Sequence, residues 1–138
     1  MKYKELNVAR PICREKRTFV FIRSRLKSFA YAANGISVFF KTETNAAIHL
    51  FVAFLVLIVS VLLNISSAEI IVVTFSIAFV WVTEMINTAI ERTMDLISPE
   101  EHPEVKVIKD IAAGAVLMAS ISAVIAGCII FIPKLFLV

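Results

Sequence analysis

Polar side chains with the chemistry of a catalytic site recur at helical spacing in one stretch of the chain: Glu84, Asn87, Thr88, Glu91 and Asp95. At 100° per residue these side chains fall within roughly 100° of one another, so they share one face of a helix. The residues before them, Ile70–Val82, carry no charge. Carboxylates at membrane depth are costly and usually functional, so this face points to chemistry at a membrane.

The depth of Glu84 follows from its place along this helix. If Ile70 lies at the outer edge of a bilayer, a rise of 1.5 Å per residue puts Glu84 about 21 Å further in. The hydrocarbon layer is about 30 Å thick, so Glu84 lies inside it, Glu91 lies near its inner edge and Asp95 lies in water. Glu84 is thereby placed to accept a proton from a hydroxyl group that never leaves the membrane.

Other charged residues can join this face near the inner membrane edge, among them Glu43, Lys109 and Asp110. Carboxylates with an amide and a lysine suit metal-bound polyphosphate, because Mg²⁺ is held by one or two carboxylates plus phosphate oxygens. Taken singly, each residue also has an ordinary interpretation as a helix-end charge, a span anchor or, for Glu84, part of an ion path. His49 fits an interfacial hydrogen-bonding residue better than a catalytic one.

The composition is that of an integral membrane protein with all-α structure. Of the 138 residues, 59% are hydrophobic and 18% are charged. Three apolar stretches predict transmembrane helices over about 46–63, 69–95 and 107–132. The chain has three glycines and no glycine-rich phosphate loop, which excludes a P-loop kinase.

Residues 25–41 predict an amphipathic helix that lies along the inner membrane surface. Its apolar stripe includes Leu26, Phe29 and Ile36, and Lys27 and Tyr31 lie on the opposite face. Residues 1–24 form a basic arm, which we expect to attract anionic lipid headgroups rather than nucleic acid. The membrane domain is then 25–138.

The distribution of Lys and Arg predicts the orientation. Most of them lie in the first 41 residues and none lies in the 64–69 connection. The positive-inside rule therefore places the N-terminus and the 92–109 region in the cytoplasm. Because three helices offer little interior for the polar face of 84–95, we also expect a homo-oligomer.

The residues Glu84–Asp95, EMINTAIERTMD, resemble the signature of the small prokaryotic diacylglycerol kinase family, which includes the undecaprenol kinases. The stretches 96–103 and 109–117 are similar to the same family, and the similarity covers about Arg25 to Leu135. The resemblance implies a homotrimer of three-span subunits in the bacterial cytoplasmic membrane, with an ATP-dependent reaction that phosphorylates a lipid alcohol. It implies Mg²⁺ as the cofactor and the membrane lipid, ATP and further copies of the chain as partners.

The resemblance also implies roles for individual residues. Glu84 corresponds to the base that activates the lipid hydroxyl, and Asn87 helps to orient the substrate. Glu43 and Glu91 correspond to the pair that holds the metal on the ATP phosphates. The further positions expected around the nucleotide are Tyr31, Asp95, Glu100, Glu101, His102, Lys109 and Asp110.

Two questions stay open at this point. The 98–103 loop and His49 favour undecaprenol over diacylglycerol, but a cavity built near Phe51, Phe54, Phe75 and Phe79 would accept either kind of chain. The rival function is a small oligomeric channel or ion carrier with an acidic lining. Against it, the acidic residues gather at one side of the membrane and Ile70–Val82 offers little polar lining.

Overall fold

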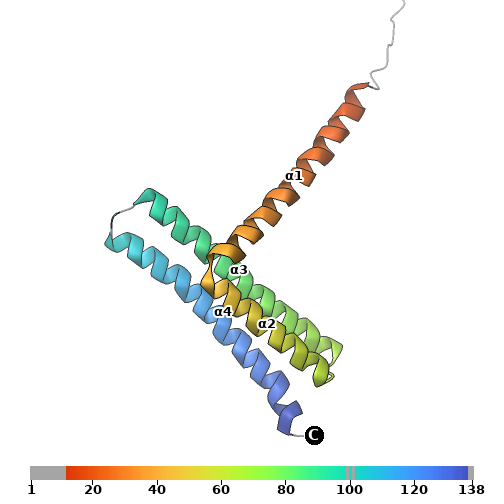
Figure 1. Ribbon diagram of the computed structural model, residues 1–138, viewed down its shortest axis with the longest axis vertical. Coiled ribbons are helices and arrows are strands. Elements are labelled where there is room, and N and C mark those ends of the chain that lie inside the picture. The colour runs from red at the N-terminus through yellow and green to blue at the C-terminus, as the bar shows by residue number, and fades with distance from the viewer. Residues whose placement is uncertain (1–11, 99, 101, 137–138) are drawn as a thin grey trace, which may run out of the picture. The chain divides into compact units, whose positions relative to one another are not determined.

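The computed structural model describes residues 12–98, 100 and 102–136, and within them the regular secondary structure is all α-helix (Figure 1). The helices are α1 (Ile12–Thr42), α2 (Thr44–Leu62), α3 (Ser67–Ile97) and α4 (Pro103–Phe136). The chain divides into two compact units, residues 1–38 and residues 39–138. The second unit contains the last turn of α1 and all of α2, α3 and α4.

Helices α2, α3 and α4 are each long and apolar enough to cross a membrane. Helices are therefore found where the three spans were predicted, with changes at their ends. Helix α4 begins at Pro103 and ends at Phe136, so it extends beyond the predicted 107–132 in both directions. Both extensions carry the charged and polar residues expected where a helix leaves a membrane.

Helix α1 is longer than the predicted 25–41 segment. It begins at Ile12, so the boundary expected at residue 25 is not a helix boundary. The sequence from Ile12 to Asn34 contains neither glycine nor proline and is rich in Arg, Lys and Glu, which are good helix formers. The earlier part of the predicted arm, residues 1–11, lies outside the described residues.

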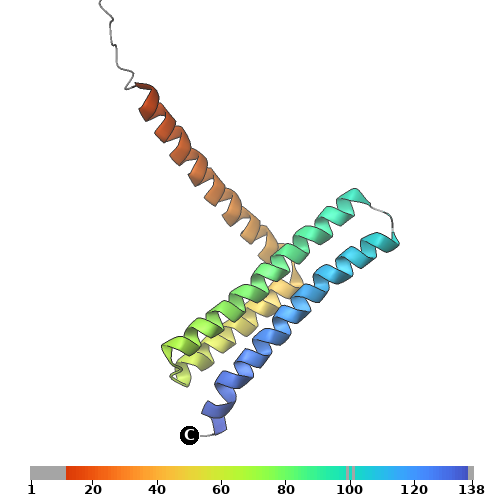
Figure 2. The same cartoon turned by 180° about the vertical axis from the view of Figure 1, so that it is seen from behind.

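Helices α3 and α4 form an antiparallel pair, side by side in both views (Figures 1 and 2). An ion pair joins them near each end. Asp95 Oδ1 lies 2.5 Å from Lys109 Nζ, near the 98–102 loop. Glu69 Oε2 lies 3.3 Å from Lys134 Nζ, near the 63–66 turn. We call these two ends of the unit the loop end and the turn end.

Buried residues recur at seven-residue intervals from the end of α1 through α2, α3 and α4, and those of α2 and α4 are small. A seven-residue repeat returns the same face of each helix to its neighbour, and small side chains let the backbones approach closely. The buried positions that follow this interval are Phe39, Ala46, Ala53 and Ser60, then Val73, Val80 and Asn87, then Ala112 and Ala119. The face of α3 that this repeat buries is also the face that carries Glu84.

The turn end has the tight connection that the sequence predicts. Asn64 adopts a positive φ of 47°, which Asn tolerates better than most residues. Ser66 then caps α3: its hydroxyl accepts a hydrogen bond from Glu69 N at 3.4 Å, and its own N–H donates to Glu69 Oε2 at 2.6 Å. This cap fixes where α3 begins, and therefore where its polar face falls.

Candidate functional site

The polar face of α3 changes from buried to exposed toward the loop end. Glu84, Asn87 and Thr88 are 3%, 7% and 8% exposed, Glu91 is half-buried and Asp95 is exposed. Three helices of one chain are therefore enough to bury the deepest part of this face. One chain buries the deepest part of this face but not Glu91 or Asp95, and the expected homo-oligomer stays a prediction.

Asn87 links the buried and exposed parts of the face. Its Nδ2 donates a hydrogen bond to Glu91 Oε1 at 3.0 Å. Among the described residues, its Oδ1 is buried and has no hydrogen-bond partner. Because Glu84 lies three residues earlier on the same face, a hydroxyl group there would find two oxygen acceptors.

Glu43 lies beside the same part of α3, held there by Arg92. Glu43 is the one residue between α1 and α2, with extended backbone at φ −104° and ψ 116°. Its Oε1 accepts hydrogen bonds from Arg92 Nη2 at 2.8 Å and from Thr42 Oγ1 at 3.1 Å. Arg92 Nη2 also donates to Thr42 Oγ1. Arg92 directly follows Glu91 in the sequence, so Glu43 lies beside the turn of α3 that carries Glu91, while the Arg92 and Glu91 side chains point about 100° apart.

A polar cavity of about 580 Å³ lies at the loop end. Five of the residues expected around the nucleotide line it, namely Asp95, Glu100, His102, Lys109 and Asp110. Its size is in the range of small-molecule sites. The structure thus gathers these residues as expected, while Glu101 lies outside the described residues.

Tyr31 is not brought to this cavity by anything the structure shows. It belongs to the first unit, where it is exposed on α1. Its expected place near the nucleotide stays a prediction.

Sequence reasoning missed two cations at the site, Arg92 and Lys106. Arg92 was passed over because its side chain points about 100° away from Glu91 on the helix. Lys106 lines the loop-end cavity with Lys109. Lys106 precedes Lys109 by three residues and Asp110 by four, and residues at these spacings share a helical face. This spacing could have identified Lys106 as a site residue from the sequence.

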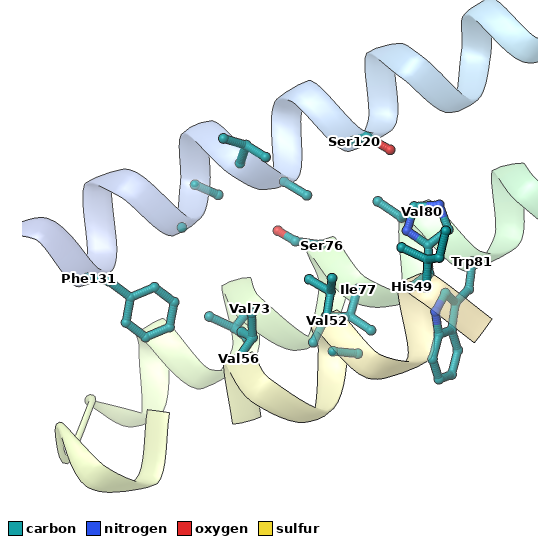
Figure 3. A pocket seen from close by; sticks show the side chains of 16 residues that line it. His49, Val52, Val56, Val73, Ser76, Ile77, Val80, Trp81, Ser120 and Phe131 are labelled. Carbon is teal, nitrogen blue, oxygen red and sulfur yellow. The ribbon is translucent and has the colours of Figure 1, made fainter. Parts of the chain in front are cut away.

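A second, apolar cavity of about 360 Å³ lies between α2, α3 and α4 (Figure 3). It extends from Phe131 toward Val80, which lies one helical turn before Glu84. His49, Trp81, Ser76 and Ser120 add a few polar atoms to the lining. Phe51, Phe54, Phe75 and Phe79 are exposed and do not line this cavity themselves. The residues next to them in the sequence do line it, namely Val52, Ala53, Ser76 and Val80.

The residues at the loop end suit a hard cation brought by a nucleotide. Within the described residues, no three His, Cys, Asp or Glu side chains form a cluster that could hold a metal. Glu43 and Glu91 offer only oxygen ligands, and Mg²⁺ is commonly held by one or two carboxylates with phosphates and water completing the shell. The donor set therefore fits Mg²⁺ that arrives on a polyphosphate.

Comparison with known proteins identifies the family. Residues 30–131 match the family described as prokaryotic diacylglycerol kinase. The chain is 41% identical over 109 residues to the undecaprenol kinase of Bacillus subtilis, covering 79% of this chain and 89% of that protein. It is 39% identical over 111 residues to the diacylglycerol kinase of a Synechocystis species, covering 80% of this chain and 63% of that protein.

These similarities decide between the two functions considered from the sequence. The family and both relatives are lipid kinases, and the channel interpretation has no support from them. Three helices long and apolar enough to cross a membrane agree with a kinase that works on lipids. The chain therefore belongs to the prokaryotic diacylglycerol kinase family and is a membrane lipid kinase.

Proposed function

We propose that this chain transfers the γ-phosphoryl group of Mg·ATP to the hydroxyl of a polyprenyl alcohol such as undecaprenol. The observation that carries the proposal is the position of Glu84. The Glu84 side chain is 3% exposed. It lies one helical turn after Val80, which lines the apolar cavity, and two turns before Glu91 on the same face of α3. A proton acceptor thus lies between a site for a hydrocarbon chain and a site for a nucleotide.

Glu84 accepts the hydroxyl proton as the lipid oxygen forms its bond to the γ-phosphorus. The bond between that phosphorus and the oxygen bridging to the β-phosphate breaks, and ADP leaves. Asn87 helps to orient the substrate, because its Nδ2 has a second N–H, beside the one donated to Glu91 Oε1, that can donate to the lipid oxygen. Such a positioned base contributes typically 10²–10⁴-fold to the rate.

Glu43 and Glu91 would hold Mg²⁺ on the phosphates. When bound, the ion neutralises charge that develops on the phosphoryl oxygens. Lys106 and Lys109 line the adjacent cavity and supply fixed positive charge for the polyphosphate. We assign the nucleotide to this cavity, with Asp95, Glu100, Glu101, His102 and Asp110 around it and Tyr31 contributed by α1.

The apolar cavity supports a substrate with one hydrocarbon chain. Its volume of about 360 Å³ is enough for a segment of a hydrocarbon chain. A cavity of about 150 Å³ already holds benzene. The similarity to an undecaprenol kinase, which extends over 89% of that protein, agrees with this choice.

We propose the assembly and orientation that the family resemblance implies. The enzyme is a homotrimer in the bacterial cytoplasmic membrane, with the N-terminus and the loop end in the cytoplasm. The helix within residues 25–41 lies along the inner membrane surface. The half-buried Glu91 and exposed Asp95 leave room for a neighbouring subunit to complete the nucleotide site.

The substrate is tested with purified protein in detergent, given Mg·ATP and either undecaprenol or diacylglycerol. We expect undecaprenol to gain phosphate at least about tenfold faster, because one isoprenoid chain fills the cavity without a second chain left outside. Thin-layer separation of radiolabelled products measures both rates. Faster phosphorylation of diacylglycerol would overturn the substrate assignment, and phosphorylation of neither lipid would overturn the proposed function.

A variant that fills the cavity tests where the chain binds. Gly127 lines the cavity, and a Cβ added there meets only Phe131 Cδ2 at 3.9 Å, an ordinary contact. We expect Gly127→Leu to raise the KM for undecaprenol about tenfold, because the new side chain takes up apolar surface that the lipid would bury. Gly114→Leu is the matched control outside the cavity lining. An equal effect of both variants would contradict the assignment.

A further inference from the structure

Arg92 holds a carboxylate that the proposed function assigns to the metal. Its Nη2 lies 2.8 Å from Glu43 Oε1, and it donates to the hydroxyl of the adjacent Thr42. Because Glu43 lies between two helices and forms no side-chain cap for α2, the helix ends do not set the direction of its side chain. Arg92 and Thr42 therefore set the direction of the Glu43 carboxylate.

We propose that Arg92 and the metal nucleotide compete for the Glu43 carboxylate. The Arg92 guanidinium pairs with the Glu43 carboxylate when no nucleotide is bound, and it binds the phosphates when Mg·ATP is bound. This inference rests on the proposed function. It makes Arg92 a nucleotide-binding residue in the bound state and an electrostatic substitute for the metal in the empty state.

The charges and exposure of the pair favour such an exchange. Arg92 supplies a cation to the Glu43 carboxylate, so a metal ion that binds this carboxylate replaces one positive charge with another. The Arg92 side chain is 47% exposed and the Glu43 side chain 26%. Ion pairs this exposed are weak, so a divalent cation can displace the guanidinium. A guanidinium binds phosphate through two parallel hydrogen bonds, which gives it a new partner.

The exchange is tested by two binding measurements on Arg92→Gln, neither of which needs turnover. Electron paramagnetic resonance measures the binding of Mn²⁺ alone, and then of Mn²⁺ with a non-hydrolysable ATP analogue. We expect Mn²⁺ alone to bind about two- to fivefold more tightly, since Glu43 has lost its competing cation. We expect Mn²⁺ with the analogue to bind at least about tenfold more weakly, since the phosphates have lost the guanidinium.

Two further variants separate this role from a structural one. Arg92→Lys keeps the charge on Glu43 but loses the planar fork, so Mn²⁺ alone should bind as in the parent while the analogue complex binds more weakly. Lys134→Gln breaks another exposed ion pair, with Glu69 at the turn end, and should change neither affinity.

The fluorescence of Trp81, the chain's single tryptophan, gives an independent reading. Its ring packs edge-on against the ring of Phe40, and the two ring centroids are 5.5 Å apart. Phe40 lies three residues before Glu43 in the sequence. We expect the Mn²⁺ analogue complex to shift the emission of the parent, and to shift it less in Arg92→Gln.

The outcomes distinguish the proposals. Weaker binding of both ligands by Arg92→Gln would mean that Arg92 only positions Glu43, and unchanged binding of both would mean that it does neither. Either result overturns the exchange. If the parent does not bind the Mn²⁺ analogue complex at all, the proposed function itself fails.

Discussion

Glu84→Gln is expected to lower kcat by a factor of about 10²–10⁴, the range typical for loss of a general base. Glutamine is close to glutamate in size and can still form hydrogen bonds. We therefore expect the packing of α2 and α4 around position 84 to be kept. Binding of Mn²⁺ with a non-hydrolysable ATP analogue should be unchanged, because Glu84 contacts the lipid hydroxyl and not the nucleotide. Initial rates with undecaprenol at saturating Mg·ATP measure the effect.

Glu69→Gln is the matched control for this prediction. It makes the same chemical change at the turn end of the same helix, where Glu69 caps α3 and pairs with Lys134. We expect it to keep kcat within a few-fold of the parent. Activity of Glu84→Gln within that same range would refute the base assignment.

Glu91→Gln and Glu43→Gln are each expected to raise the Mg²⁺ concentration needed for half-maximal rate by about tenfold or more. Each variant removes a charged oxygen ligand, and interactions with charged groups are the stronger kind. The effect should be larger for Glu91, because Glu43 shares its carboxylate with Arg92. Rates measured over a series of Mg²⁺ concentrations at fixed ATP provide the test.

Glu104→Gln is the control for these two variants, since Glu104 lies exposed in the first turn of α4 and does not line the loop-end cavity. It should leave the Mg²⁺ dependence of the parent unchanged. An unaltered Mg²⁺ dependence in both Glu91→Gln and Glu43→Gln would show that the two carboxylates do not share a metal.

The sequence was enough to predict the three spans and the polar face of α3. Runs of apolar residues long enough for a bilayer leave few alternatives to a helix, because lipid offers no partners for backbone groups. The helical period then places Glu84, Asn87 and Glu91 on one side of α3 regardless of what packs there. The position of Lys109 and Asp110 at the start of the third apolar stretch predicted that they lie near the same membrane edge, and the structure pairs Lys109 with Asp95.

Other features depend on how helices pack, which periodicity within one helix does not determine. The burial of Glu84 is one of them, because residues of other helices must cover this part of α3. The apolar cavity likewise exists only between three helices, so the aromatic residues expected to line it point outward instead. Arg92 was missed because its partner Glu43 is 49 positions away in the sequence.

The depth of the carboxylates along α3 is the central claim, and cysteine labelling measures it most directly. Single cysteines replace Glu84, Glu91 and Asp95 in turn, after Cys13 and Cys128 are changed to serine. A membrane-impermeant maleimide is then applied to each face of sealed vesicles.

We expect Asp95→Cys to react fastest, Glu91→Cys more slowly and Glu84→Cys least, all from the cytoplasmic face. Rapid labelling of position 84 from the external face would contradict the account, because a base that is open to that side could not share a reaction with ATP in the cytoplasm.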